Sequence, residues 1–159
     1  MNLKENAGVK GELSVYLDYH DNKPRVEHFR KGNLIVTDTK RFLLSGVYSS
    51  GVVSDPVTSL QAGVGGTIDP EGLYPKSEEP AQTGLWDSII TVPTVYVLDL
   101  VNIKVTFLAD ISQSESNNQL INEAGLFTNL GDLFSVKNFP AVTKTNQFSI
   151  HFEWSIYFL

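Results

Sequence analysis

The sequence predicts a mainly β protein, an antiparallel β-sandwich, with a closed barrel as the second choice. Apolar and polar residues alternate with a period of two over several stretches, which is typical of strands with one buried and one solvated face. Turn-forming residues separate these stretches, and their spacing predicts about six to eight strands. A chain of 159 residues is long enough for a single domain with one core.

The N-terminal part predicts an arm followed by a β-hairpin. Residues 1–10 show no periodicity and are expected to form the arm. Residues 20–24 contain Asp, Asn and Pro, which favour a turn, and residues 25–31 should return as an antiparallel partner. Gly32 and Asn33 are expected to end that strand. The apolar positions of the first strand are Leu13, Val15, Leu17 and Tyr19.

One short helix is expected after a brief apolar stretch at residues 34–36. Thr37, Asp38 and Thr39 are candidate N-cap residues for it. The apolar side chains that follow can form one stripe, which should cover an end or a face of the sheets. These side chains are Phe42, Leu43, Leu44, Val47 and Tyr48.

Residues 54–93 are expected to form a long loop rich in glycine and proline, with a short strand at residues 57–62 as an option. Long loops inside compact domains are usually functional or interface segments. Large apolar side chains in this loop are predicted to bind a neighbouring subunit, as Trp and Tyr often do at interfaces. They are Leu73, Tyr74, Leu85 and Trp86.

The second half of the chain predicts further strands. Residues 89–100 are β-prone but interrupted at Pro93, and residues 112–118 form a polar connection. Residues 120–127 predict a strand, followed by a turn, a short return strand and a proline-containing loop. Residues 102–111 alternate clearly, and the positions expected to face inward are Ile103, Val105, Phe107, Ala109 and Ile111.

The final strand, residues 147–158, has the longest alternation in the sequence. A strand of this length should be central in its sheet or extended by a neighbouring subunit. Its apolar positions are Phe148, Ile150, Phe152, Trp154, Ile156 and Phe158.

Several motifs follow one another in the C-terminal third. They are Asn122-Glu123-Ala124-Gly125-Leu126-Phe127, Phe139-Pro140, Lys144 and Glu153-Trp154. This series resembles a C-terminal pattern of tailed-bacteriophage virion proteins, namely small tail, neck and fibre-associated proteins. Upstream, the resemblance extends to residues 33–36 and to the glycine-rich residues 61–66. It implies that Glu123, Gly125, Lys144 and Trp154 form part of a structural motif.

Glu123 lies inside an otherwise apolar strand. A buried carboxylate must be paired or protonated. The expected partners of Glu123 are the turn that follows its strand, or Lys137 or Lys144. Gly125 would then allow the close approach of a neighbouring strand or ring.

The composition limits the possible partners. The absence of cysteine excludes disulfides, thiol catalysis and cysteine-based metal sites. A formal charge of −6 argues against nucleic acid as the main partner. The basic residues between positions 23 and 41 are interpreted as a solvated hairpin and helix start, with a nucleic-acid patch as the alternative. No stretch is long and apolar enough for a membrane span, and the N-terminus lacks the pattern of a signal peptide, so no membrane partner is expected.

The candidate catalytic and ligand-binding groups lack the spacing that such chemistry needs. His20, His28 and His151 show no metal-type spacing, and His151 is expected at the surface. The glycine-rich residues 63–67 are not followed by the lysine and helix of a phosphate-binding loop. No catalytic residue, cofactor site or metal site is therefore predicted.

Two pairs of acidic residues in the loop were considered as chemical groups. Asp69 with Glu71, and Glu78 with Glu79, could supply oxygen ligands to a cation or the two acids of a glycosidase. Neither pair has supporting ligands or sugar-stacking aromatic residues at a defined spacing. Both pairs are interpreted as solvated loop charges.

These observations and the resemblance together predict a non-enzymatic structural component of a tailed-phage virion. It would assemble as a ring or small oligomer in the tail, neck or fibre-attachment region, after synthesis in the host cytoplasm. Its partners would be copies of itself and other virion proteins, with no small-molecule substrate. The alternatives are a capsid decoration protein, a receptor- or glycan-binding module of the same particle, and a carbohydrate-active enzyme.

Overall fold

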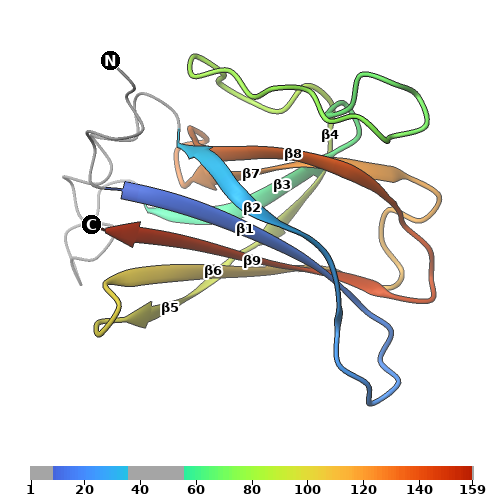
Figure 1. Cartoon of the computed structure of the whole chain (residues 1–159), viewed down its shortest axis with the longest axis horizontal. Helices are drawn as coiled ribbons and strands as arrows, with labels where there is room; N and C mark the ends of the chain where they lie inside the picture. The colour runs from blue at the N-terminus through green and yellow to red at the C-terminus, as the bar shows by residue number, and fades with distance from the viewer. Residues whose placement is uncertain (1–8, 36–55, 159) are drawn as a thin grey trace.

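The computed structural model describes residues 9–35 and 56–158. Within these residues all regular elements are β-strands, and their antiparallel arrangement in two sheets confirms the predicted sandwich (Figure 1). None of the described residues belongs to a helix that could cross a bilayer. The strands are β1 (Val9–Asp18), β2 (Val26–Ile35), β3 (Val57–Gly63), β4 (Ser88–Pro93), β5 (Val95–Asp99), β6 (Lys104–Ile111), β7 (Leu120–Thr128), β8 (Leu133–Thr143) and β9 (Ser149–Phe158).

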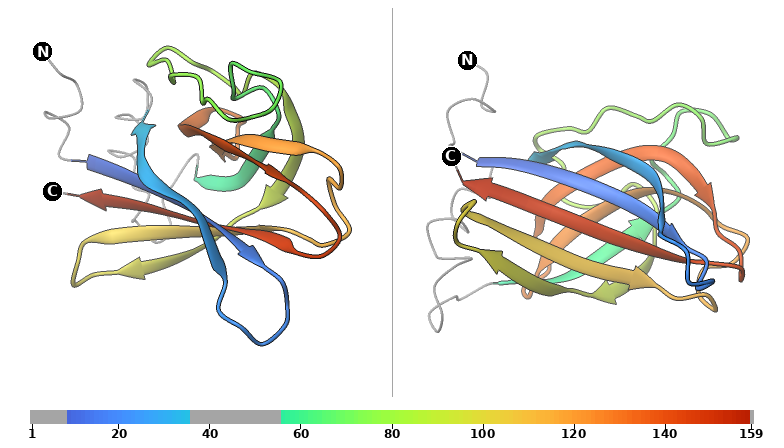
Figure 2. Two further views of the ribbon diagram at one scale, coloured as in Figure 1. Left: turned by 45° about the vertical axis from the view of Figure 1, so that its right-hand side comes forward. Right: turned by 60° about the horizontal axis from the view of Figure 1, so that its bottom comes forward.

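The strands follow the order β4-β3-β7-β8-β2-β1-β9-β6-β5. We call the β5-β6-β9-β1-β2 layer sheet I and the β2-β8-β7-β3-β4 layer sheet II. The chain turns both corners between them (Figure 2). At one corner β2 pairs with β1 in sheet I and, through Leu34 and Ile35, with β8 in sheet II. At the other corner β4, paired with β3, continues through Thr94 into β5, which pairs with β6.

The core lies between the two sheets, and β9 is central to sheet I. This strand pairs with β1 on one side and with β6 on the other, which confirms its predicted central position. Its alternation also matches the burial pattern, because one parity of side chains enters the core. The buried side chains of this parity are Phe148, Ile150, Phe152, Trp154 and Ile156.

Sheet II differs from sheet I because its central strands are buried on both faces. Residues 121–128 of β7 are all buried. The inner face contributes Ile121 and Leu126 to the main core. The outer face is covered by residues 64–87, which connect β3 to β4 and pass over β7 and β8 (Figure 1). This explains why β7 reads as an apolar run instead of an alternating strand.

Three boundaries in the N-terminal half differ from the sequence predictions. The strand β1 begins at Val9, inside the expected arm. Gly32 and Asn33 do not end β2, because both continue the ladder opposite Glu12 and Gly11. The helix expected at about residues 37–48 lies outside the described residues.

Two further boundaries differ in the middle and C-terminal parts. The expected loop over residues 54–93 contains β3 and β4, so the loop itself is residues 64–87. The return strand and proline-containing loop form one strand, β8, which runs through Pro140. Proline is tolerated there because the β7–β8 pairing passes from Asn138 to Val142, so Pro140 has no ladder bond to lose.

Ile103 was predicted to face inward with the alternate residues of β6, but it is exposed. It precedes β6, in the turn after β5, and its φ of 50° takes it out of the extended conformation. The other four positions are buried as predicted: Val105, Phe107, Ala109 and Ile111.

The burial pattern of β9 predicts the effect of truncating its side chains. Phe152→Ala should lower the free energy of unfolding by about 3–5 kcal/mol, because it opens a cavity in the core. Ser155→Ala, on the opposite parity, loses one hydrogen bond to Thr106 and should cost about 1 kcal/mol or less. Denaturant unfolding of both variants measures the difference, and equal losses would contradict the placement of β9.

Candidate functional site

A network of hydrogen bonds and one ion pair fastens residues 64–87 to sheet II. We call these residues the β3–β4 loop. Its first half folds back on itself, with Ile68 N donating to Tyr74 O (2.8 Å) and Lys76 N donating to Gly66 O (2.8 Å). The tip is closed by Asp69, whose carboxylate accepts hydrogen bonds from Leu73 N (2.9 Å) and Tyr74 N (2.7 Å). These bonds lower the pKa of Asp69, the bond from Leu73 most of all.

Glu123 of β7 holds both ends of the β3–β4 loop. Its side chain is fully buried and accepts three backbone hydrogen bonds. Gly65 N (3.1 Å) and Asp87 N (2.7 Å) donate to Oε1, and Trp86 N (3.0 Å) donates to Oε2. Hydrogen bonds to a charged group contribute about 1.5–3 kcal/mol each, and they compensate for the loss of water around the carboxylate. The partners of Glu123 are therefore loop amides and not the expected lysines or following turn.

Asn122 binds the same loop from the neighbouring position. Consecutive strand residues normally point to opposite faces, but the β7–β8 register shifts between Ile121 and Glu123. Asn122 Oδ1 accepts from Gly66 N (2.7 Å), and its Nδ2 donates to Thr67 Oγ1 (2.9 Å). A side chain on Gly66 would collide with the Asn122 carbonyl, so this close approach requires glycine.

Strand β8 provides a second set of attachments. Glu78 accepts from Asn138 N (2.8 Å) and forms an ion pair with Lys137 (3.1 Å). Asn138 Nδ2 donates to Lys76 O (3.0 Å). Lys76 in turn donates from Nζ to Gly65 O (2.7 Å). Each of these groups ties the middle of the loop to the sheet or to its own first residues.

Apolar contacts complete the attachment of the loop. Leu85 packs on a small cluster of Phe127, Leu133 and Val136 on the outer side of sheet II. Gly125 leaves room for it, because an added Cβ there would lie 3.1 Å from the Leu85 side chain. These contacts turn Leu85 towards its own subunit.

The other three predicted interface residues face outward. Leu73 and Tyr74 are 61% and 65% exposed. Trp86 is 39% exposed, and the Lys76 ammonium lies 5.1 Å from the centre of its ring. Ile68, which the sequence analysis did not single out, is 75% exposed on the same loop. The loop thus exposes apolar side chains to solvent, while side chains of β7 and β8 hold its backbone.

The remaining motif residues, Lys144 and Trp154, lie away from the loop. Lys144 is buried, and its Nζ donates to Asn117 Oδ1 (2.9 Å), Thr145 O (2.8 Å) and Gln113 O (3.2 Å). Burial lowers the pKa of Lys144, while the nearby Glu115 carboxylate opposes this shift. Lys144 thereby fastens the connection between β6 and β7. Trp154 fills the core between the sheets.

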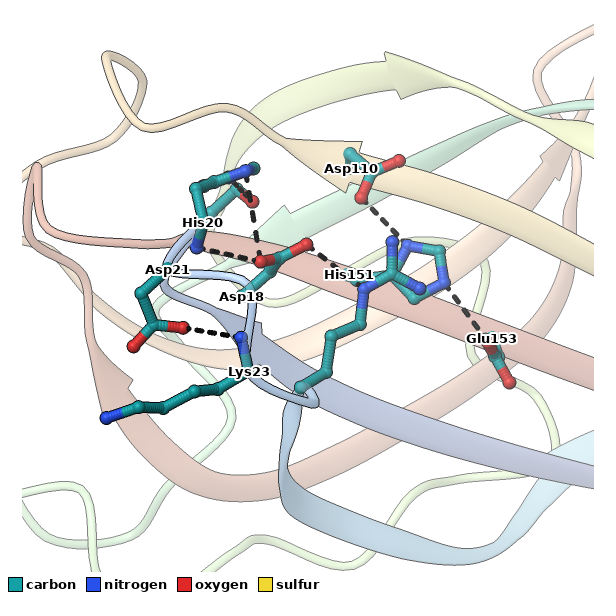
Figure 3. A network of polar contacts seen from close by, with 9 residues as sticks. Asp18, His20, Asp21, Lys23, Asp110, His151 and Glu153 are labelled. Carbon is teal, nitrogen blue, oxygen red and sulfur yellow. Dashed lines mark hydrogen bonds and ion pairs between the residues drawn. The ribbon is translucent and has the colours of Figure 1, made fainter.

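The histidines have partners within the chain, and the prediction that His151 lies at the surface is wrong. His151 is 5% exposed, with Nδ1 2.8 Å from Asp110 Oδ1 and Nε2 3.2 Å from Glu153 Oε1 (Figure 3). His20 Nε2 lies 2.8 Å from Ser149 Oγ, and His28 Nε2 lies 2.6 Å from Pro140 O. His151 is buried although it belongs to the polar parity of β9, because its ring inserts between neighbouring side chains of sheet I.

An open cleft of about 550 Å³ lies beside the first half of the loop. Its described lining residues include Asp69, Lys76 and Asn122, and none of them is aromatic. The Asp69 and Glu78 carboxylates, considered above as ligands or catalytic acids, are engaged by the loop amides and by β8. Within residues 9–35 and 56–158, no group of three or more His, Cys, Asp or Glu side chains could hold a metal ion.

Among the polar anchors of the β3–β4 loop, the sequence pattern indicates Glu123, but not the residues on β8 and in the loop that also hold it; Gly125 is indicated as well. Asn122 carried a usable signal, since it is a polar residue in a strand that is otherwise almost entirely apolar and buried. Lys76 and Glu78 carried none, because their partner on β8, Asn138, lies about sixty positions away in the sequence. No protein-family model, curated protein sequence or solved structure matches this chain.

The geometry around Glu123 predicts the effect of neutralising it. In Glu123→Gln the amide NH₂ would face at least one backbone N–H, whichever way it is turned, and this should cost about 1–3 kcal/mol of stability. Glu71→Gln makes the same change at an exposed position of the same loop and should be nearly neutral. Denaturant unfolding and limited proteolysis should separate them, with faster cleavage within residues 64–87 only in Glu123→Gln. Equal stability and equal cleavage would contradict the anchoring role.

Proposed function

We propose that this chain is a non-enzymatic structural component of a tailed-phage particle, which binds neighbouring subunits through its β3–β4 loop. The phage setting rests on the resemblance of the C-terminal motifs. The binding role rests on one observation, the fixed loop that carries exposed Leu73 and Tyr74. The neighbours would be copies of the chain or other virion proteins in the tail, neck or fibre-attachment region.

The physical argument for a binding surface is the cost of ordering a loop. A mobile loop loses conformational entropy when a partner holds it, and this loss weakens binding. Here the loss is already compensated within the fold, because Glu123, Asn122 and Asn138 hold the loop backbone. Exposed Tyr and Leu on a preorganised backbone are suited to form the buried centre of a protein interface.

The same surface favours a protein partner over a glycan. Sugar-binding sites stack aromatic rings along a groove, whereas the described lining of the cleft beside this loop contains none. The exposed aromatic Tyr74 lies at the loop tip among Ile68 and Leu73, which offer apolar area without hydroxyl-binding groups. This distribution supports an assembly contact and not the alternative of a glycan-binding module.

The loop surface predicts a specific loss of assembly. The double variant Leu73→Ser/Tyr74→Ser should keep the folding stability of the wild type, since both side chains are mostly exposed. It should weaken self-association by roughly 2 kcal/mol or more, because it removes the apolar centre of the contact. Light scattering after size-exclusion chromatography over a range of concentrations measures this loss.

Leu130→Ser is the matched control, since Leu130 is 73% exposed on the turn between β7 and β8. It should assemble as the wild type does. If the double variant and the control have the same mass at every concentration, the loop is not the contact between copies.

A further inference from the structure

We propose that the open edge of β5 is a second assembly site, at which β5 pairs antiparallel with β5 of a second copy around a twofold axis. Among the described strands β5 pairs with β6 alone, so its other edge has no strand beside it. The contact would join sheet I of two copies into one continuous sheet. This second site extends the proposed function. It rests on that function only in the assumption that copies of the chain assemble with one another.

The exposure of β5 is unusual for a strand of a folded domain. Strands of a sandwich normally bury one face, but the side chains on both faces of β5 are exposed. The exposed fractions are 64% for Val95, 63% for Tyr96, 55% for Val97 and 41% for Leu98. The turn after β5 adds Leu100, Val101 and Ile103, which are 80%, 91% and 56% exposed.

The edge of β5 also lacks the protection that monomeric proteins give to edge strands. Edges are usually blocked by charged side chains, proline or a bulge. The run from Val95 to Leu98 has no charge, and its pairing with β6 is regular. The two charges nearest to this run are engaged elsewhere, since Asp99 accepts hydrogen bonds from Asn102 and Lys104 lies over the Tyr157 ring.

A second copy of the chain is a suitable partner for this uncharged run, because two such runs can pair without bringing like charges together. In a symmetric antiparallel pair one residue lies opposite its own copy, and centring on Tyr96 places Val95 opposite Val97 of the second copy. Apolar and aromatic residues then meet across the pair on both faces, and no like charges are brought together. Although the chain as a whole carries a charge of −6, none of it lies in this run.

The size of the apolar surface is also appropriate. The β5 strand and its turn carry the seven exposed apolar residues named above. At roughly 100 Å² each, they offer on the order of 700 Å² per copy, close to what one partner contributes to a standard interface. An apolar surface of this extent is uncommon on a monomer.

The two proposed contacts lie on different sides of the molecule. Figures 1 and 2 place the β5–β6 hairpin away from the β3–β4 loop, with the sandwich between them. One contact therefore cannot cover both surfaces. A chain with two such surfaces can form dimers through β5 and larger assemblies through the loop.

The test exploits the twofold symmetry of the contact. Val97→Lys and Val97→Glu each place like charges close together across the axis, and each should weaken dimerisation at least about 10-fold. Mixing the two variants should restore dimers, because opposite charges then meet. Leu130→Lys, an exposed control outside the strand, should behave as the wild type does. The loop variant Leu73→Ser/Tyr74→Ser provides the background, so that only the β5 contact is measured by sedimentation velocity.

Hydrogen exchange supplies the second measurement. The outward-facing amides of β5 should exchange slowly in the dimer and rapidly in Val97→Lys, since strand pairing alone bonds them. The proposal is overturned if the loop variant is monomeric at every concentration, if Val97→Lys dimerises like the control, or if the mixture stays monomeric. Any of these outcomes would leave the loop contact untouched, because that contact is tested with β5 unchanged.

Discussion

The three backbone N–H groups held by the Glu123 carboxylate are the interaction on which the rest of the structure depends. Two of its donors, Trp86 and Asp87, end the β3–β4 loop, while the third, Gly65, begins it. One buried side chain thus closes a long loop at its base. A carboxylate without these donors would be costly to bury, and a loop without the carboxylate would lack its main attachment. Each therefore requires the other.

The closed loop explains the asymmetry of the sandwich. The β3–β4 loop covers the outer faces of β7 and β8, so their side chains are buried. The outer face of sheet I is not covered by this loop and carries polar side chains, among them His151 between Asp110 and Glu153. Exposed apolar residues gather at two locations, the loop tip and the edge of β5. Both lie on a fixed backbone, one through buried polar anchors and the other through pairing with β6. Such preorganised surfaces reduce the entropy lost on assembly, which supports the proposed role as a repeated subunit.

The sequence predicted β1, β6 and β9 of sheet I well, because one face of each strand is buried and the alternation is preserved. It predicted sheet II less well. The strand β8 was divided at Pro140, since nothing local shows that the β7–β8 ladder skips that residue. The sequence indicates that Glu123 is a buried acid, but the predicted partners, the following turn or a lysine, are wrong. Its donors are main-chain N–H groups of a distant loop, which a sequence pattern does not reveal. Lys76 and Glu78 could not be found at all, because only the tertiary fold brings them to Asn138.

The central claim is that Glu123 fixes the β3–β4 loop at its base, and amide hydrogen exchange of the wild-type chain tests it most directly. If the carboxylate holds these donors, the amides of Gly65, Trp86 and Asp87 should exchange only when sheet II opens, at the slow rates of the β7 amides. Rapid exchange at these three amides, while β7 stays protected, would mean that the loop moves independently of the sheet and would contradict the account.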